Sequence, residues 1–266
     1  MSHTDVLFPG RFRDLADFYT TGRPTYPPLL ARRVADLVGL NGSQTVLDLG
    51  TGPGFLAVDF YPFAEKVIGV DPEPAMLNAA RRNAQKAGVE IEFVDGSAND
   101  LGPRFGRLHL VTIGRAFHWM DRPRTLEALD ALIEPTGAVA LFQESYPSVP
   151  ANAWLATFQA ILDHYGAEDP AREQTHRNKD HEAVLLDSAF SHLERVAVLE
   201  QRQTSIEHIV DRSLSYGRAW QGRPGSRLKD MALEVRDALA PYVKNGHVLE
   251  VLEGSALIAR RQAAIA

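Results

Sequence analysis

Hydrophobic residues in this chain follow two alternating patterns. Short apolar runs that suit buried strands are separated by longer segments in which apolar residues recur every three or four positions, as on one face of a helix. The runs that predict strands cover residues 45–49, 66–70, 108–113 and 138–142. Helical periodicity covers residues 28–38, 74–87 and 123–133. Strands that alternate with helices of these lengths predict an α/β fold with a doubly wound, mostly parallel, Rossmann-like sheet.

Some element boundaries carry their own signals. Pro28 suits the start of a helix and Gly39 its end, and Gly88 closes the helix predicted over 74–87. Residues 89–94 alternate apolar and charged side chains, which indicates a half-exposed strand at an edge of the sheet.

The pattern loosens after residue 145. The elements expected there are helices over 151–165, 206–220 and 226–240, strands over 193–202 and 255–260, and a polar loop over 166–181. This mixture does not continue the regular alternation of the first half of the chain.

Composition narrows the class of protein. The chain has 266 residues, 45% of them hydrophobic, which suits one globular domain with a core. The net charge of −6 without a run of like charge argues against a nucleic-acid partner, because such binding relies on basic surface. No cysteine is present, which excludes disulfides, thiolate metal sites and cysteine nucleophiles. No apolar run reaches the ~18 residues of a membrane span, and MSHTDVLFPGRFRD lacks the apolar core of a signal peptide, so a soluble cytoplasmic protein without a membrane partner is expected.

The most informative stretch is VLDLGTGPG at 46–54, followed by VIGVD at 67–71. Each segment reads as a buried strand, the first entering a glycine-rich turn and the second ending on Asp71. A turn of glycines lets the backbone approach a ligand closely, because no Cβ stands in the way. An acid at the tip of the next parallel strand can accept two hydrogen bonds from a ribose diol. Together they predict a bound nucleoside.

Asp48 distinguishes between two kinds of nucleoside ligand. The dinucleotide fingerprint is G-x-G-x-x-G, whereas the spacing here is Gly50-x-Gly52-x-Gly54 with Asp48 just ahead of it. A carboxylate beside a pyrophosphate repels it by roughly 1–4 kcal/mol for unit charges about 4 Å apart near a wet surface. The same carboxylate suits a ligand that carries an ammonium and a sulfonium.

At these residues the chain resembles the class I S-adenosylmethionine-dependent methyltransferases. LDLGTGPG matches their acid-x-G-x-G-x-G turn, Asp71 matches the acid that closes their second strand, and DGSA at 95–98 stands where a polar loop lies near the adenine. The resemblance implies S-adenosylmethionine as cofactor. The cofactor-binding residues it implies here are Asp48, Gly50, Thr51, Gly52, Gly54, Asp71, Pro72, Asp95, Gly96, Ser97 and Ala98.

Two further segments narrow the resemblance. AFHW at 116–119, together with the segment at 19–27 that contains Tyr19, Arg23 and Tyr26, is similar to the small-molecule branch that includes trans-aconitate methyltransferases. By that resemblance Tyr19 and Arg23 hold the methionine carboxylate, which the planar fork of an arginine grips well. The alternative is that Arg23 belongs to a helix-entry turn and that Tyr26 packs in the core.

The resemblance also implies how the chain is organised. It implies one methyltransferase domain over 1–266, in which the last two strands form an antiparallel hairpin at one edge of the sheet. Its parts are an N-terminal helical lid over 1–43, a cofactor-binding core over 44–145, cap helices over 146–253 with one strand added near 193–202, and a last strand and tail over 254–266.

In open α/β sheets the ligand lies beyond the carboxyl ends of the strands, where the strand order reverses. The turn after the strand at 108–113 therefore faces the cofactor, and Arg115 in that turn is a further candidate for cofactor binding. Phe117 and Trp119 are candidates for an apolar wall of the substrate pocket, although Trp119 also suits ordinary packing. Arg218, in the expected cap, is a candidate partner for an anionic acceptor, although most arginines are solvated surface charges.

His118 is the candidate catalytic residue. Methyl transfer from a sulfonium is an in-line displacement in which the enzyme mainly supplies orientation. A base helps when the acceptor is a hydroxyl or an ammonium and is unnecessary for a carboxylate. The alternative for His118 is structural, as a side chain that anchors its loop. No spacing of histidines and acids indicates a metal site.

The expected function is methyl transfer from S-adenosylmethionine to a small-molecule acceptor. An NAD(P)-dependent oxidoreductase fits the fold class but neither the glycine spacing nor Asp48. A non-catalytic protein that binds S-adenosylmethionine is the other alternative. The acceptor, the attacking atom and the oligomeric state stay open at this point.

Overall fold

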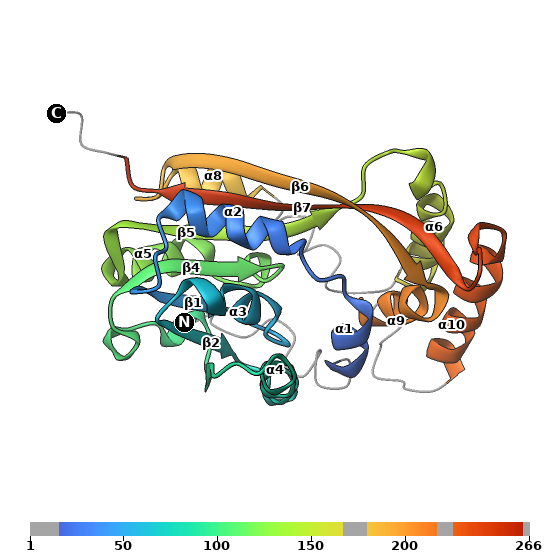
Figure 1. The fold of residues 1–266 in the computed structure, drawn as a ribbon, viewed down its shortest axis with the longest axis horizontal. Helices are drawn as coiled ribbons and strands as arrows, with labels where there is room; N and C mark the ends of the chain where they lie inside the picture. The colour runs from blue at the N-terminus through green and yellow to red at the C-terminus, as the bar shows by residue number, and fades with distance from the viewer. Residues whose placement is uncertain (1–15, 167–179, 217–225, 263–266) are drawn as a thin grey trace, which may run out of the picture.

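The structure, a computed structural model, describes residues 16–166, 180–216 and 226–262. This part of the chain forms a seven-stranded sheet in the order β3-β2-β1-β4-β5-β7-β6 (Figure 1). The strands are β1 (Thr45–Leu49), β2 (Lys66–Asp71), β3 (Glu92–Asp95), β4 (Leu108–Gly114), β5 (Ile133–Ser145), β6 (His192–Ser205) and β7 (His247–Arg260).

The strand pairing confirms a mostly parallel sheet with an antiparallel hairpin at one edge. β1 pairs in parallel with β2 and β4, β2 with β3, and β4 with β5. β7 then runs antiparallel to β5, and β6 antiparallel to β7. The order reverses between β1 and β4, so the carboxyl ends of these two strands flank the place where ligands bind in such sheets.

Helices cover both faces of the sheet, as the alternation of elements predicts. The covering helices are α2 (Pro28–Val38), α3 (Phe55–Phe60), α4 (Pro74–Ala87), α5 (Arg122–Leu132) and α8 (His181–Leu186). The other described α-helices are α1 (Ala16–Gly22), α6 (Leu155–Tyr165), α9 (Ile206–Ser215) and α10 (Ser226–Leu239). The predicted bounds of α2 and α4 are confirmed, and each ends at a left-handed glycine, Gly39 and Gly88.

Adjacent residues of one strand serve opposite cores because strand side chains alternate between faces. Val46 and Leu110 pack with α2 and α3 on one face. Leu47 and Val111 pack with α5 and α8 on the other. A third apolar cluster joins α6, α9 and α10 near one end of the long β6–β7 hairpin (Figure 1). The cap helices therefore have a core of their own.

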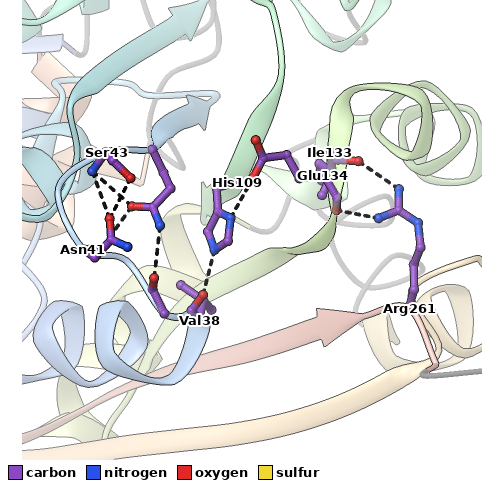
Figure 2. Close-up of polar contacts among 9 residues, drawn as sticks. Val38, Asn41, Ser43, His109, Ile133, Glu134 and Arg261 are labelled. Carbon is purple, nitrogen blue, oxygen red and sulfur yellow. Dashed lines mark hydrogen bonds and ion pairs between the residues drawn. The ribbon is translucent and has the colours of Figure 1, made fainter.

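Figure 2 shows the polar contacts that close the end of β4 opposite to its carboxyl end. His109 Nε2 lies 2.7 Å from the carbonyl oxygen of Val38, at the end of α2, and Nδ1 lies 3.0 Å from Glu134. Arg261 donates to the carbonyl oxygens of Ile133 and Glu134. These contacts fix the start of β5. The candidate site lies at the opposite end of the sheet.

Several predicted boundaries were wrong. β5 begins at Ile133 rather than at residue 138, and β7 begins at His247 rather than at residue 255. The amino-terminal half of β7 pairs with β6 beyond the core of the sheet, where its charged residues obscure the strand pattern. The predicted polar loop over 166–181 and the end of the helix predicted over 206–220 extend beyond the described residues.

Among the described residues, no helix combines the length and the apolar character that crossing a membrane requires.

Leu110, in the centre of β4, is fully buried. We expect Leu110→Ala to lower the free energy of unfolding by about 2–5 kcal/mol, because the substitution leaves a cavity between β4 and α2. Urea denaturation measures this loss. Leu199→Ala is the matched control, since Leu199 on the edge strand β6 is 58% exposed, and an equal loss in both variants would contradict the assigned core.

Candidate active site

The glycine turn after β1 packs directly against the loop after β4. A Cβ on Gly50 would lie only 2.6 Å from the Cβ of Ala116, and Gly50 has a left-handed φ of 71°. Gly54, with φ 79°, stands at the start of α3 against Ala80 of α4. Side chains at these two positions would push the turn away from its neighbours, so the glycines are required by space as well as by conformation.

Asp71, at the tip of β2, is hydrogen-bonded into that turn. One carboxylate oxygen accepts from the backbone N–H of Gly52 at 2.8 Å and the other from the N–H of Glu73 at 2.9 Å. Burial raises the pKa of Asp71 to about 6. A carboxylate has about four acceptor positions, so these two bonds leave capacity for two more donors.

Asp48 is buried inside the sheet behind the turn. Its oxygens accept from the hydroxyl of Thr51 at 2.6 Å and from the hydroxyl of Thr112 at 2.8 Å. Burial raises the pKa of Asp48 to about 6 despite these bonds. The side chain thus ties the turn to β4, and a direct contact of Asp48 with a cationic ligand stays a prediction.

Asp59 of α3 is a half-buried acid that the sequence analysis missed. Its Oδ2 atom is buried without a hydrogen-bond partner among residues 16–166, 180–216 and 226–262. Desolvation, with a smaller effect from the charge of Asp48, raises the pKa of Asp59 to about 7. No motif marks this residue, because it lies one turn inside a short helix.

The loop that was expected near the adenine follows β3 and is connected to Asp71. Gly96 donates its backbone N–H to the carbonyl oxygen of Asp71 at 3.3 Å. The Ser97 hydroxyl accepts the backbone N–H of Asn99 at 3.2 Å and so caps the short helix that begins at Ala98, and it donates to Asp100 at 2.9 Å. Asp95 is exposed at the end of β3, and Pro72 is exposed directly after Asp71.

Arg115, which follows β4, joins three parts of the chain. It has a left-handed φ of 57°, and its Nη1 donates to the carbonyl oxygen of Pro24 at 3.1 Å and to Glu144 at 2.9 Å. Its guanidinium lies 5.6 Å from the ring centre of Tyr19 and 5.0 Å from that of Tyr26. The segment before α2 is thereby fixed to the carboxyl ends of β4 and β5.

Arg23 reaches the same carboxylate. Its Nη1 lies 3.6 Å from Glu144, and its guanidinium stacks 3.9 Å above the ring of Tyr216 and 5.0 Å from that of Tyr19. Two mostly buried arginines therefore share one acid, which leaves an excess of one positive charge. The Nε atoms of Arg23 and Arg115 are buried without hydrogen-bond partners in the described part of the chain.

Glu144 was missed by the sequence analysis. The only available signal is an acid two residues after the apolar run at 138–142. Tyr26 lies in the core and donates its hydroxyl to the carbonyl oxygen of Phe142 at 3.3 Å, as the structural alternative proposed.

His118 lies in a short helix, η4 (Phe117–Trp119), within electrostatic range of Arg23 and Arg122. Its ring packs 4.7 Å from the ring of Trp119. Burial, reinforced by His181, Arg23 and Arg122, lowers the pKa of His118 to about 4. The imidazole is therefore neutral at pH 7, and the lowered pKa makes it a weaker base than a free histidine.

The predicted pocket residues occupy different environments. Phe117 is 2% exposed in the core beneath the sheet and packs edge-on against His181. Trp119 is half-buried at the end of the same short helix. Arg218 lies outside the described residues. Their contribution to a substrate pocket stays a prediction.

The structure brings most of the predicted site residues together at the carboxyl ends of the parallel strands. The glycine turn, Asp71 and the loop after β3 lie on one side of the switch point, and Arg115 and His118 lie on the other. Among the residues the structure describes, no cluster of three or more histidines and acids is arranged to hold a metal ion.

Comparisons with known proteins agree with this arrangement. Residues 46–137 match the methyltransferase domain family. A 129-residue region, 48% of this chain and 49% of the relative, is 30% identical to an uncharacterized methyltransferase of Schizosaccharomyces pombe. A 143-residue region, 51% of this chain and 64% of the relative, is 33% identical to the demethylmenaquinone methyltransferase of Thermus thermophilus. The chain thus spans roughly half to two thirds of the length of the curated relatives it matches.

Solved structures support the fold. A methyltransferase from Geobacter sulfurreducens in complex with S-adenosyl-L-homocysteine superposes with a TM-score of 0.56, covering 97% of this chain and 100% of that one at 15% identity. At this identity the likeness concerns the arrangement of strands and helices alone.

The raised pKa of Asp59 fixes the direction in which the free energy of unfolding changes with pH. The folded protein binds this proton more tightly than the unfolded chain does, so the free energy of unfolding falls as the pH rises from about 4 to about 7. We expect Asp59→Asn to raise the free energy of unfolding at pH 8 by about 1 kcal/mol or more, with a gain that shrinks toward pH 4.

Urea denaturation over a series of pH values measures this gain. Asp36→Asn is the matched control, because Asp36 is exposed on α2. A gain of equal size at every pH would show that titration of Asp59 is not its cause.

Proposed function

We propose that this chain, a member of the class I S-adenosylmethionine-dependent methyltransferases by its matched domain and its fold, moves the methyl group of S-adenosylmethionine to a small-molecule acceptor. The observation that carries this proposal is the carboxylate of Asp71, which is held by the backbone of the glycine turn and retains acceptor capacity. Such an acid suits the two hydroxyls of a ribose.

The proposed contact between Asp71 and the ribose determines where the other parts of the cofactor lie. The bare backbone of the turn allows the adenosyl group to approach, and the loop over residues 95–98 is the proposed neighbour of the adenine. No phosphate is needed, which agrees with the two buried acids beside the turn, Asp48 and Asp71, and with the half-buried Asp59 of α3.

Arg23 and Arg115 are the proposed partners of the methionine carboxylate. Their shared acid, Glu144, neutralises only one of the two charges, and an added carboxylate balances the other. Buried Nε atoms without partners in the described ranges are donors that such an anion satisfies. Tyr19 lies beside both guanidiniums and completes the proposed subsite.

In the proposed reaction a lone pair of the acceptor attacks the methyl carbon. The bond between carbon and sulfur breaks, its electron pair stays on sulfur, and S-adenosylhomocysteine leaves. An acceptor hydroxyl or ammonium must also lose a proton, and His118 is the proposed base because it lies in the turn after β4, at the switch point of the sheet.

A thermal-shift comparison tests the cofactor. A ligand at 100 times its dissociation constant stabilises a protein by about 2.7 kcal/mol, which is readily detected. We expect S-adenosylhomocysteine to stabilise the chain and the nicotinamide dinucleotides to have no effect. The reverse result would support an oxidoreductase. Incubation with methyl-labelled S-adenosylmethionine and fractionated metabolites then tests turnover, and binding without any labelled product would indicate a non-catalytic protein.

We expect Asp71→Ala to weaken binding of S-adenosylhomocysteine by about 1–3 kcal/mol, because the ribose hydroxyls lose their acceptor and the turn loses a tie. Calorimetric titration measures the change. Asp36→Asn, on the exposed surface of α2, is the control. Unchanged affinity in Asp71→Ala would remove this residue from the site.

We expect His118→Asn to lower kcat by about 10²–10⁴-fold with a hydroxyl or ammonium acceptor, and to leave the affinity for S-adenosylhomocysteine unchanged. With a carboxylate acceptor, which needs no base, kcat should stay close to that of the unaltered chain. Rates are compared by release of S-adenosylhomocysteine. An undiminished kcat with a hydroxyl or ammonium acceptor would leave His118 with only a structural role.

A further inference from the structure

The helix that precedes Arg23, α1, packs against the cap helices. α1 packs against α9, although the two helices are far apart in the sequence (Figure 1). A Cβ added to Gly22, the last residue of α1, would lie 2.3 Å from the backbone nitrogen of Arg212 and 2.5 Å from the carbonyl oxygen of Asp211. Backbone meets backbone at this point, so only glycine fits.

Arg212 is fixed from several sides. It is 1% exposed, and its guanidinium makes two bonds with Glu250 of β7, at 2.7 and 3.0 Å. It also donates to the hydroxyl of Tyr146 at 2.9 Å. Glu250 in turn accepts from the hydroxyl of Thr204 on β6 at 2.6 Å. A bidentate arginine with this many partners has little rotational freedom.

The remaining nitrogen of Arg212 faces α1. Its Nε donates to the carbonyl oxygen of Gly22 at 3.4 Å. The next residue is Arg23, whose guanidinium stacks on Tyr216, directly after the last residue of α9. The cap therefore contacts both the backbone before Arg23 and one face of its guanidinium, whereas Glu144 of β5 pairs with the end of the same side chain.

We propose that Arg212 is a positioning residue, which acts through Gly22 to hold Arg23 where it binds the methionine carboxylate. This inference rests on the proposed function. It makes the affinity for the amino-acid part of the cofactor depend on a buried ion pair in the cap, outside the cofactor-binding turn. The adenosyl part, bound by Asp71 and the glycine turn, does not depend on that pair.

The first variant is Gly22→Ala, because it keeps both side chains of the Arg212–Glu250 pair and forces the backbones of Gly22 and Arg212 apart. We expect it to weaken binding of S-adenosylhomocysteine about tenfold. Binding of 5′-methylthioadenosine, which has the same adenosyl group but no amino-acid part, should be unchanged. Thr21→Ala is the matched control, since Thr21 is exposed and bonds only within α1.

Two further variants separate positioning from general stability. Arg212→Lys keeps the charge but loses the fork, and it should weaken S-adenosylhomocysteine and not 5′-methylthioadenosine. In an Arg23→Met background, Gly22→Ala should cause no additional loss.

Equal losses for both ligands, an unchanged affinity in Gly22→Ala, or a full additional loss without Arg23 would each overturn the inference. If the unaltered chain binds neither ligand, the proposed function itself fails. Binding of both ligands by the unaltered chain, with no discrimination in the variants, defeats only the positioning role of Arg212.

Discussion

The close approach of two backbones at the carboxyl ends of β1 and β4 is the constraint on which the rest of the site depends. Gly50 lies against Ala116 with no room for a side chain between them. Asp48 reinforces this approach from inside, because it bonds one threonine of the turn and one of β4. This part of the proposed ligand surface is thus made of backbone, whose position the sheet fixes.

A second region of the site is held together by ion pairs and not by close packing of backbone. Glu144 accepts two arginines from segments that are distant in sequence, and Glu250 holds a third with two parallel bonds. Burying such groups is costly unless each is paired, and a partner removed from a buried pair leaves the other charge uncompensated. The N-terminal segment, the sheet and the cap are therefore connected by interactions that hold only in one mutual arrangement.

The sequence predicted those helices and strands that a local pattern of residues specifies. Apolar runs and glycine caps define β1, β2, α2 and α4, because each element is specified by its own residues. The amino-terminal half of β7 was missed because Glu250 is a charged residue at a buried strand position, and only its distant partner Arg212 makes that burial acceptable. Glu144 and Asp59 were missed for the same reason, since their roles arise from neighbours brought together by the fold. The glycine turn and Asp71 were found because their geometry requires particular residue types at fixed spacing.

The bonds made by Asp48 also bear on how the proposed reaction is catalysed. Methyl transfer disperses the positive charge of the sulfonium, so a bare carboxylate against the sulfur stabilises the reactant more than the transition state. Asp48 is not bare, because two hydroxyl donors share its charge and the turn stands in front of it. Such an acid favours binding of a cationic ligand over binding of a phosphate. Its electrostatic stabilisation of the sulfonium stays moderate. In the proposed reaction, a buried, doubly bonded aspartate behind the turn therefore serves selection of the cofactor without opposing the step in which the positive charge of the sulfonium is lost.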